Sequence, residues 1–164
     1  MKKQKGFSLI ELLIVVAIIL IIAAIAIPNL LRSKMAANES SAVGSLRSIN
    51  TAQVTYATAY PTNGYATTLG QLGGAAVACA GAAFAAPANA CLIDDVLATA
   101  TTVPLAKSGY VFNLAINPTA GTTYLVQAAP ATPGTTGQRF FFTDQTGVIR
   151  YGLNSQPDNT SSPL

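Results

Sequence analysis

One apolar run constrains this chain more than any other feature. Residues 12–27 are an unbroken series of Leu, Ile, Val and Ala, and twelve of these sixteen positions are Leu, Ile or Val. At about −0.3 to −0.6 kcal/mol each, those side chains favour insertion into a bilayer by about 4 to 7 kcal/mol. The wider segment 7–31 holds one charge, Glu11, which opposes insertion by at most about 3 kcal/mol. We therefore expect residues 7–31, a length sufficient for a helix to cross a bilayer, to span a membrane.

Positive charge in front of this span sets its expected orientation. Lys2, Lys3 and Lys5 account for the whole formal net charge of +3, because the remaining Lys and Arg are balanced by Asp and Glu. By the positive-inside rule, the N-terminus stays in the cytoplasm and everything after Leu31 is exported. A cleaved secretory signal is the alternative, but it needs a shorter apolar region followed by a small-residue cleavage site. The apolar run is longer than that, and no Ala-x-Ala site directly follows it, which favours a retained span.

The composition excludes several classes of function. The 164 residues are 51% hydrophobic and 9% charged, with no histidine. Without histidine there is no Ser-His-Asp or Cys-His nucleophile pair and no His-ligated zinc. Once the N-terminal lysines are set aside, the remaining side-chain charges balance, so no basic surface is left for phosphates and we expect no nucleic-acid partner. The chain also lacks nucleotide-binding glycine motifs. We expect no enzymatic activity and no cofactor.

The span is expected to continue as a helix from residue 32 to about residue 59. One stripe of largely apolar side chains recurs there mostly at steps of three or four residues, the period of an amphipathic helix. Its members are Leu31, Met35, Ala42, Leu46, Ile49, Gln53, Tyr56 and Tyr60. Glu39 and Gln53 are its polar interruptions. The residues assigned largely to the opposite side are Arg32, Lys34, Asn38, Ser45 and Asn50. A proline and an Asn-Gly dipeptide then end the helix.

A small antiparallel sheet is expected to cover this stripe. After a loop of small residues from 61 to 104, alternating apolar positions predict strands. Their ranges are 107–116, 122–129, 139–143 and 148–153. Asp144 opens a turn between the last two strands, and Gly147 suits a positive φ there. The Ser-, Asn- and Pro-rich tail that follows is expected to be disordered. The expected fold class is therefore α+β, a long N-terminal helix packed on three or four antiparallel strands.

Glu11 is the candidate functional residue of the span. A carboxylate near the start of a membrane helix needs a cationic partner, and no basic residue lies nearby inside the span. Cleavage after Gly6 would create one, because the new amino group of Phe7 would lie one helical turn from Glu11. The alternative is that Glu11 lies in the headgroup zone beside the N-terminal lysines. On physical grounds alone, both interpretations stand.

The stretch Gly6-Phe7-Ser8-Leu9-Ile10-Glu11, the apolar run behind it and the Ile27-Pro28 step resemble the N-termini of class III prepilins. These are the precursors of type IV pilins and of the pseudopilins of type II secretion. The resemblance implies cleavage after Gly6 by a prepilin peptidase, N-methylation of Phe7, and docking of each incoming subunit through Glu11. It divides the chain into a cleaved leader, a transmembrane and filament-core helix, and an exported pilin-like portion. Their ranges are 1–6, 7–31 and 32–164.

The resemblance also implies a function, partners and a location. The chain would be a structural subunit of a type IV pilus-like filament, a homopolymer built by an inner-membrane assembly platform and its ATPase. Before assembly it would be a single-pass protein of the inner membrane, with its N-terminus in the cytoplasm. After assembly it would belong to a cell-surface or periplasmic filament. A pseudopilin of a type II secretion system is the alternative, and a membrane-tethered binding domain that never polymerises is another.

Pro28 is the candidate weak point of the long helix. It lacks an amide donor and its ring clashes with the preceding turn, so we expect it to kink or loosen the helix. In similar pilins this region melts when subunits enter the filament. The alternative is a proline that is simply tolerated near the end of the span.

Cys79 and Cys91 are an even pair in an exported region, which makes a disulfide the default expectation. The pair has no C-x-x-C spacing and no flanking base, which favours a structural cross-link over a redox site. Pilin disulfides often enclose the C-terminal region, whereas this one closes a loop ahead of the sheet.

The remaining acidic residues carry weak functional signals. Asp94-Asp95 suggests a carboxylate pair or a calcium ligand, but helix capping or solvation explains adjacent acids equally well. Asp144 is expected to shape its turn. Calcium needs six to eight oxygen ligands, and no cluster that supplies them is visible, so we expect no metal site. The aromatic residues of the strands are expected to be core.

Overall fold

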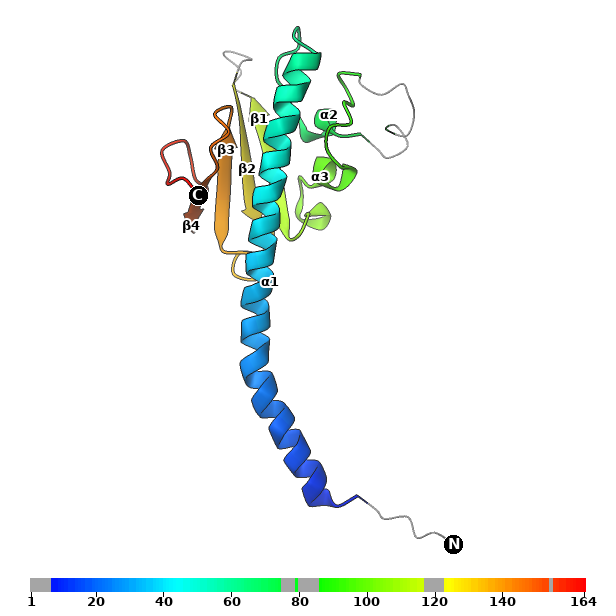
Figure 1. Cartoon of the computed structure of the whole chain (residues 1–164), viewed down its shortest axis with the longest axis vertical. Coiled ribbons are helices and arrows are strands. Elements are labelled where there is room, and N and C mark those ends of the chain that lie inside the picture. The colour runs from blue at the N-terminus through cyan, green and yellow to red at the C-terminus, as the bar shows by residue number, and fades with distance from the viewer. Residues whose placement is uncertain (1–6, 75–78, 80–85, 117–122, 154) are drawn as a thin grey trace. The chain divides into compact units, whose positions relative to one another are not determined.

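The computed structural model describes residues 7–74, 79, 86–116, 123–153 and 155–164. The chain divides into two compact units, one that ends at Lys34 and one from Met35 to Leu164. Helix α1 runs from Leu9 to Ala59 and contributes to both units (Figure 1). We call the second unit, Met35–Leu164, the head.

Helix α1 changes character along its 51 residues. Its first part is the run of Leu, Ile, Val and Ala, and its second part alternates apolar with polar residues. The helix ends at Ala59 as expected, because the ring of Pro61 cannot continue the backbone hydrogen bonding. One further hydrogen bond, from Tyr60 N–H to the Tyr56 carbonyl at 2.8 Å, closes the last turn.

In the part of the head that the structure describes, four antiparallel strands form one sheet in sequential order (Figure 1). The strands are β1 (Tyr110–Ile116), β2 (Tyr124–Pro130), β3 (Arg139–Asp144) and β4 (Arg150–Leu153). The register places Ala128 of β2 opposite both Phe112 of β1 and Phe141 of β3. A small side chain therefore lies between two large ones, which lets the helix approach the sheet. The predicted α+β fold is confirmed.

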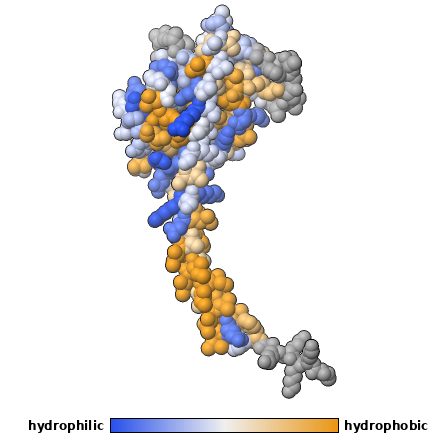
Figure 2. Space-filling model, in the orientation of Figure 1, coloured by the Kyte–Doolittle hydropathy of each residue, from blue (hydrophilic) through white to orange (hydrophobic). Residues whose placement is uncertain are grey.

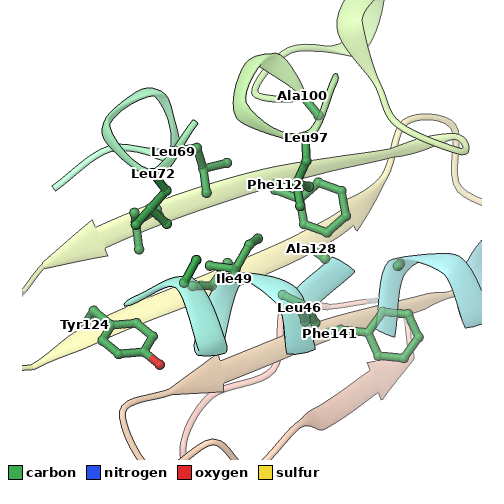
Figure 3. Packing of buried hydrophobic residues seen from close by; sticks show 14 of the residues in the cluster. Leu46, Ile49, Leu69, Leu72, Leu97, Ala100, Phe112, Tyr124, Ala128 and Phe141 are labelled. Carbon is green, nitrogen blue, oxygen red and sulfur yellow. The ribbon is translucent and has the colours of Figure 1, made fainter. Parts of the chain in front are cut away.

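The core lies where α1 packs on the sheet. The buried residues of α1 are Glu39, Ala42, Val43, Ser45, Leu46, Ile49, Ala52, Gln53 and Tyr56. Figure 3 shows Leu46 and Ile49 in one cluster with Phe112 and Phe141, and all four side chains are at most 1% exposed. Each such burial contributes about 1.5–3 kcal/mol. The apolar stripe predicted from residue 42 onward is confirmed, whereas Leu31 is exposed.

The region between α1 and the sheet is not simply a loop. Its described residues form three short helices: α2 (Leu69–Leu72), α3 (Asp95–Thr99) and the 3-10 helix η1 (Val103–Leu105). Thr68 and Gln71 form a capping box at the start of α2, and Asp94 caps α3 by accepting the Leu97 N–H at 3.2 Å. Leucines of α2 and α3 complete the core in Figure 3. Helices this short leave almost no periodic signal, so the sequence pattern did not predict them.

The prediction that the C-terminal segment is disordered is wrong. Residues 155–164 fold back along β4, where Tyr151 N–H donates to the Ser162 carbonyl at 3.1 Å and Leu164 N–H donates to the Ile149 carbonyl at 2.9 Å. An edge strand exposes unpaired backbone donors and acceptors. Hydrogen bonds to these groups order the tail, which its own side chains alone would not do. The tail therefore closes one edge of the sheet.

Candidate assembly segment

The apolar part of α1 has no partner within the described chain. Every residue from Leu9 to Leu31 except Ala23 is exposed, including Ile21 at 64% and Ile25 at 65%. Figure 2 shows most of this stretch as apolar surface, with a hydrophilic spot near its N-terminal end. Among the described residues, α1 is also the one helix long and apolar enough to cross a membrane. An apolar surface of this extent requires cover by lipid or by other proteins.

Glu11 has a partner in its own chain. The backbone N–H of Ser8 donates to Glu11 Oε2 at 2.9 Å, just before the first residue of α1. This is the glutamate half of a capping box, in which the third helical residue reaches back to the capping residue. A carboxylate there also interacts favourably with the positive end of the helix dipole. Neither interpretation from the sequence included this role, although the Ser8-x-x-Glu11 spacing is its known signal.

The other residues of the predicted site are Phe7, Gly6 and Pro28. Phe7 is 74% exposed, and Gly6 lies outside the described residues. Helix α1 passes through Pro28 without ending. Because proline has no N–H, the carbonyl of Ala24 lacks its usual helical donor. Both the expected loosening at Pro28 and its alternative, a tolerated proline, stay predictions.

Within the head, a partly buried ion pair ties α1 to the start of β3. Glu39 is 7% exposed, and its Oε2 lies 2.7 Å from Nε of Arg139. Its Oε1 accepts the backbone N–H groups of Gln138 at 2.9 Å and of Arg139 at 3.2 Å. Burial raises the pKa of Glu39, but the hydrogen bonds from Gln138 and Arg139 outweigh it and hold the pKa below the ordinary 4.5. Glu39 is therefore ionised and fully paired at neutral pH.

Arg139 links this carboxylate to the rest of the sheet. Its guanidinium carbon lies 5.5 Å from the ring centre of Phe141 and 5.9 Å from that of Tyr151 on β4, distances typical of cation–π contacts. Its carbonyl accepts the hydroxyl of Tyr110 on β1 at 2.7 Å. Burial raises the pKa of Tyr110 well above its usual value, so the hydroxyl remains a donor. One arginine thus contacts α1, β1 and β4 from its position on β3.

Two further bonds flank the ion pair. Asn38 Nδ2 donates to the Thr136 carbonyl at 2.8 Å, and Ser41 Oγ donates to Ser108 Oγ at 3.0 Å. Gly109, at φ +72°, permits this approach, since a Cβ there would lie 2.7 Å from Cβ of Thr136 and 3.2 Å from Asn38 Nδ2. We call this set of contacts the anchor: Asn38, Glu39 and Ser41 on α1, with Ser108, Thr136, Gln138 and Arg139.

The anchor was missed from the sequence, although one signal pointed to it. Glu39 interrupts a stripe whose other members are mostly apolar, and a carboxylate on a buried face requires a cationic or hydrogen-bonding partner. The partner, Arg139, lies a hundred residues away in sequence, so no local pattern identifies it.

Other polar residues of α1 contact the sheet as well. Asn50 Nδ2 donates to Thr143 Oγ1 on β3 at 2.9 Å, and its Oδ1 accepts the Tyr124 hydroxyl of β2 at 3.1 Å. Ser45 is 6% exposed. The assignment of Asn38, Ser45 and Asn50 to the outer side of the helix is therefore wrong, whereas Arg32 and Lys34 are exposed. The face of α1 that packs on the head is wider than one stripe, because the sheet reaches Asn50 as well as the apolar positions.

The predicted disulfide between Cys79 and Cys91 is present, with a Cα–Cα distance of 5.8 Å. Cys91 N–H donates to the Gly73 carbonyl at 3.1 Å, which joins this segment to the end of α2. At Gly74 a Cβ would lie 2.8 Å from Sγ of Cys79, so the cross-link packs closely on that glycine. These contacts support a structural role.

The aspartates are engaged in local structure. Asp94 caps α3 and pairs with Lys107 Nζ at 2.8 Å. Asp144 accepts the Thr146 N–H at 2.9 Å in its turn, and Gly147 there has φ +74° as expected. The described residues contain no group of three or more His, Cys, Asp or Glu side chains placed to hold a metal ion.

Comparison with known proteins identifies the N-terminal segment. Residues 1–27 match the family model for the prokaryotic N-terminal methylation motif. The chain is 48% identical over 54 residues to the type IV major pilin protein PilA of Myxococcus xanthus, which is 33% of this chain and 24% of that protein. It is 60% identical over 40 residues to the type IV wide pilus major component PilA4 of Thermus thermophilus, which is 24% of this chain and 30% of that protein.

The chain thus spans less than a third of the length of these curated relatives, and no solved structure matches it. The matched motif, the exposed apolar helix and the antiparallel sheet agree with one another. The N-terminal segment therefore carries the prokaryotic N-terminal methylation motif, the chain is similar over limited stretches to two type IV pilins, and the long apolar helix leads into an α+β head.

Proposed function

We propose that this protein is the structural subunit of a type IV pilus-like filament. The observation that carries the proposal is the exposed apolar helix of residues 9–31, with its single carboxylate and its methylation motif. Such a surface is stable in lipid and equally stable against copies of itself. The same segment therefore serves as a membrane anchor before assembly and as a filament core after it.

Processing prepares the segment for assembly. A prepilin peptidase removes residues 1–6 after Gly6, and the new N-terminal residue, Phe7, is methylated. Removal of the leader also removes Lys2, Lys3 and Lys5, the charges that hold the N-terminus at the cytoplasmic side. Residues 7–31 then remain as the single inner-membrane span, and residues 32–164 lie outside the cytoplasm.

Glu11 sets the axial register of the helices. Among the described residues its one hydrogen bond uses Oε2, toward Ser8, so Oε1 is available to the terminal ammonium of Phe7 in a neighbouring copy. A charge-assisted pair is strong in an apolar environment, and an unpaired carboxylate there is costly. A subunit in the wrong register would bury Glu11 without a partner.

Assembly requires other proteins. An inner-membrane platform and its ATPase extract each copy from lipid and add it to the filament, which emerges at the cell surface. The two relatives named above are pilus components, which favours a pilus over the pseudopilus of a type II secretion system.

Mass spectrometry and two substitutions test this function. The intact mass of protein from sheared surface fibres should lack residues 1–6 and carry one methyl group and one disulfide. Glu11→Ala and Glu11→Gln should both be processed but assemble poorly, because neither supplies a charge for the neighbouring terminus. Glu11→Gln is the matched control for helix capping, since glutamine also serves in a capping box. Normal filament yield from Glu11→Gln would refute the docking role, and a full-length species confined to membranes would support a tethered binding domain instead.

A further inference from the structure

The anchor occupies the first part of α1 that the head holds. Glu39 is the first buried residue of the helix. Asn38 and Ser41, the other two residues of the anchor on α1, lie within one turn of it. The next polar contacts of α1 are those of Asn50 and Gln53. Eleven residues separate Glu39 from Asn50, about 16 Å of helix.

We propose that the anchor is a mechanical latch that carries tension from α1 into the sheet. The inference rests on the proposed function, in which residues 7–31 are held in a filament core. Of the described elements, α1 is the one that belongs to both units. Force applied to the filament therefore reaches the head along the backbone of α1, and it meets the anchor first.

The bonding at Glu39 suits this role. Both carboxylate oxygens are used, the shortest contact is 2.7 Å, and Glu39 itself is buried. Charge-assisted bonds of this kind are roughly twice as strong as neutral ones. Arg139 passes the load on to three strands through its contacts with Tyr110 and Tyr151. Apolar neighbours such as Leu46 resist separation only in proportion to the apolar area that they bury, and this interaction has no preferred direction.

Without the latch, α1 would separate from the head turn by turn. Opening of the whole anchor, including the bonds of Asn38 and Ser41, leaves residues 35–49 held to the described parts of the head by apolar contacts, up to the polar contacts at Asn50. The proposal therefore predicts a local unit of opening with defined ends. Such units are measurable by hydrogen exchange, because amides in a region that opens exchange faster than those in the rest of the fold.

The first test is Glu39→Gln in the full chain, purified in detergent micelles and followed by hydrogen exchange. Amides of residues 36–48 should exchange about 10- to 100-fold faster, the range expected when bonds to a charged group are lost. Amides of residues 50–59 should be unchanged. Asp94→Asn is the matched control, because it makes the same charge change in the exposed Lys107 pair and leaves the anchor intact. Asn38→Ala, which removes the bond to Thr136 alone, should give a several-fold local increase even if Glu39→Gln fails to fold.

The second test is the extension of filaments under load in an optical trap. Filaments of Glu39→Gln should lengthen or break at lower force than those of the wild type or Asp94→Asn. Exchange in residues 36–48 that matches the Asp94→Asn control would overturn the proposal, as would acceleration spread evenly over α1 and the sheet. Local opening without any change in the force response would also overturn it. If the wild type forms no filament, the proposed function fails and the latch fails as a carrier of tension, while the exchange pattern still shows whether the anchor holds α1.

Discussion

Gln53 offers the sharpest test of how α1 is fixed to the head. Its side chain is fully buried and acts as both donor and acceptor toward one residue. Nε2 donates to the Ala66 carbonyl at 3.0 Å, and Oε1 accepts the Ala66 N–H at 2.9 Å. Ala66 is itself 1% exposed, so water does not replace these bonds when they are lost.

The substitution Gln53→Met keeps the side-chain volume and removes both bonds. Methionine is flexible enough to fill the same space, so the cavity contribution is small. Two buried backbone groups of Ala66 then lack partners, at about 1–3 kcal/mol each. We expect the free energy of unfolding to fall by about 2–5 kcal/mol, a large share of the roughly 5–15 kcal/mol typical of a domain.

Urea unfolding of the full chain in micelles, followed by near-UV circular dichroism of the tyrosines, measures this loss. Gln127→Met is the matched control, because Gln127 is half-buried on β2 and the structure shows no hydrogen bond from its side-chain amide to the described residues. Its substitution should change stability by less than about 0.5 kcal/mol. If both variants lose the same small amount, paired backbone bonding at Ala66 does not stabilise the fold and the reasoning is refuted.

Three further predictions concern the same fold. Folding lowers the pKa of Glu39. The contribution of Glu39 to stability is therefore fully present above the unfolded pKa near 4.5, and it is lost as the pH falls through the lower folded pKa. In an acid titration, the wild type should lose stability more steeply below pH 4.5 than Glu39→Gln does. Gly44 lies inside α1, and a Cβ at this position would meet nothing within 4 Å, so Gly44→Ala should raise the urea midpoint by the equivalent of about 0.5–1 kcal/mol, and a loss of stability would show an unrecognised contact. The pair Cys79→Ser and Cys91→Ser opens a loop with a sequence separation of 12 and should cost about 3 kcal/mol, with a thermal midpoint unchanged by reducing agent in the variant but lowered by it in the wild type.

The fold was largely predictable because its elements have strong periodic signals. The apolar run and the three-to-four-residue stripe predicted α1, Pro61 placed its end at about residue 59, and alternation located all four strands to within a few residues. The largest error at a strand start was at β1, which begins at Tyr110 because Ser108 and Gly109 have positive φ and form a turn. The short helices and the ordered tail carry no comparable pattern, since capping bonds and edge pairing hold them in place.

The residues that fix α1 to the head were not predictable for a different reason. Periodicity reports which face of a helix is buried, and it treats Glu39 and Gln53 alike as interruptions. In the structure both make the most specific contacts of that face, Glu39 with a partner a hundred residues away and Gln53 with one thirteen residues away. A buried polar side chain requires a partner, so an interruption in an apolar stripe predicts that a partner exists without naming it. The two polar residues in the stripe, rather than its apolar positions, therefore fix the register in which α1 packs on the rest of the head.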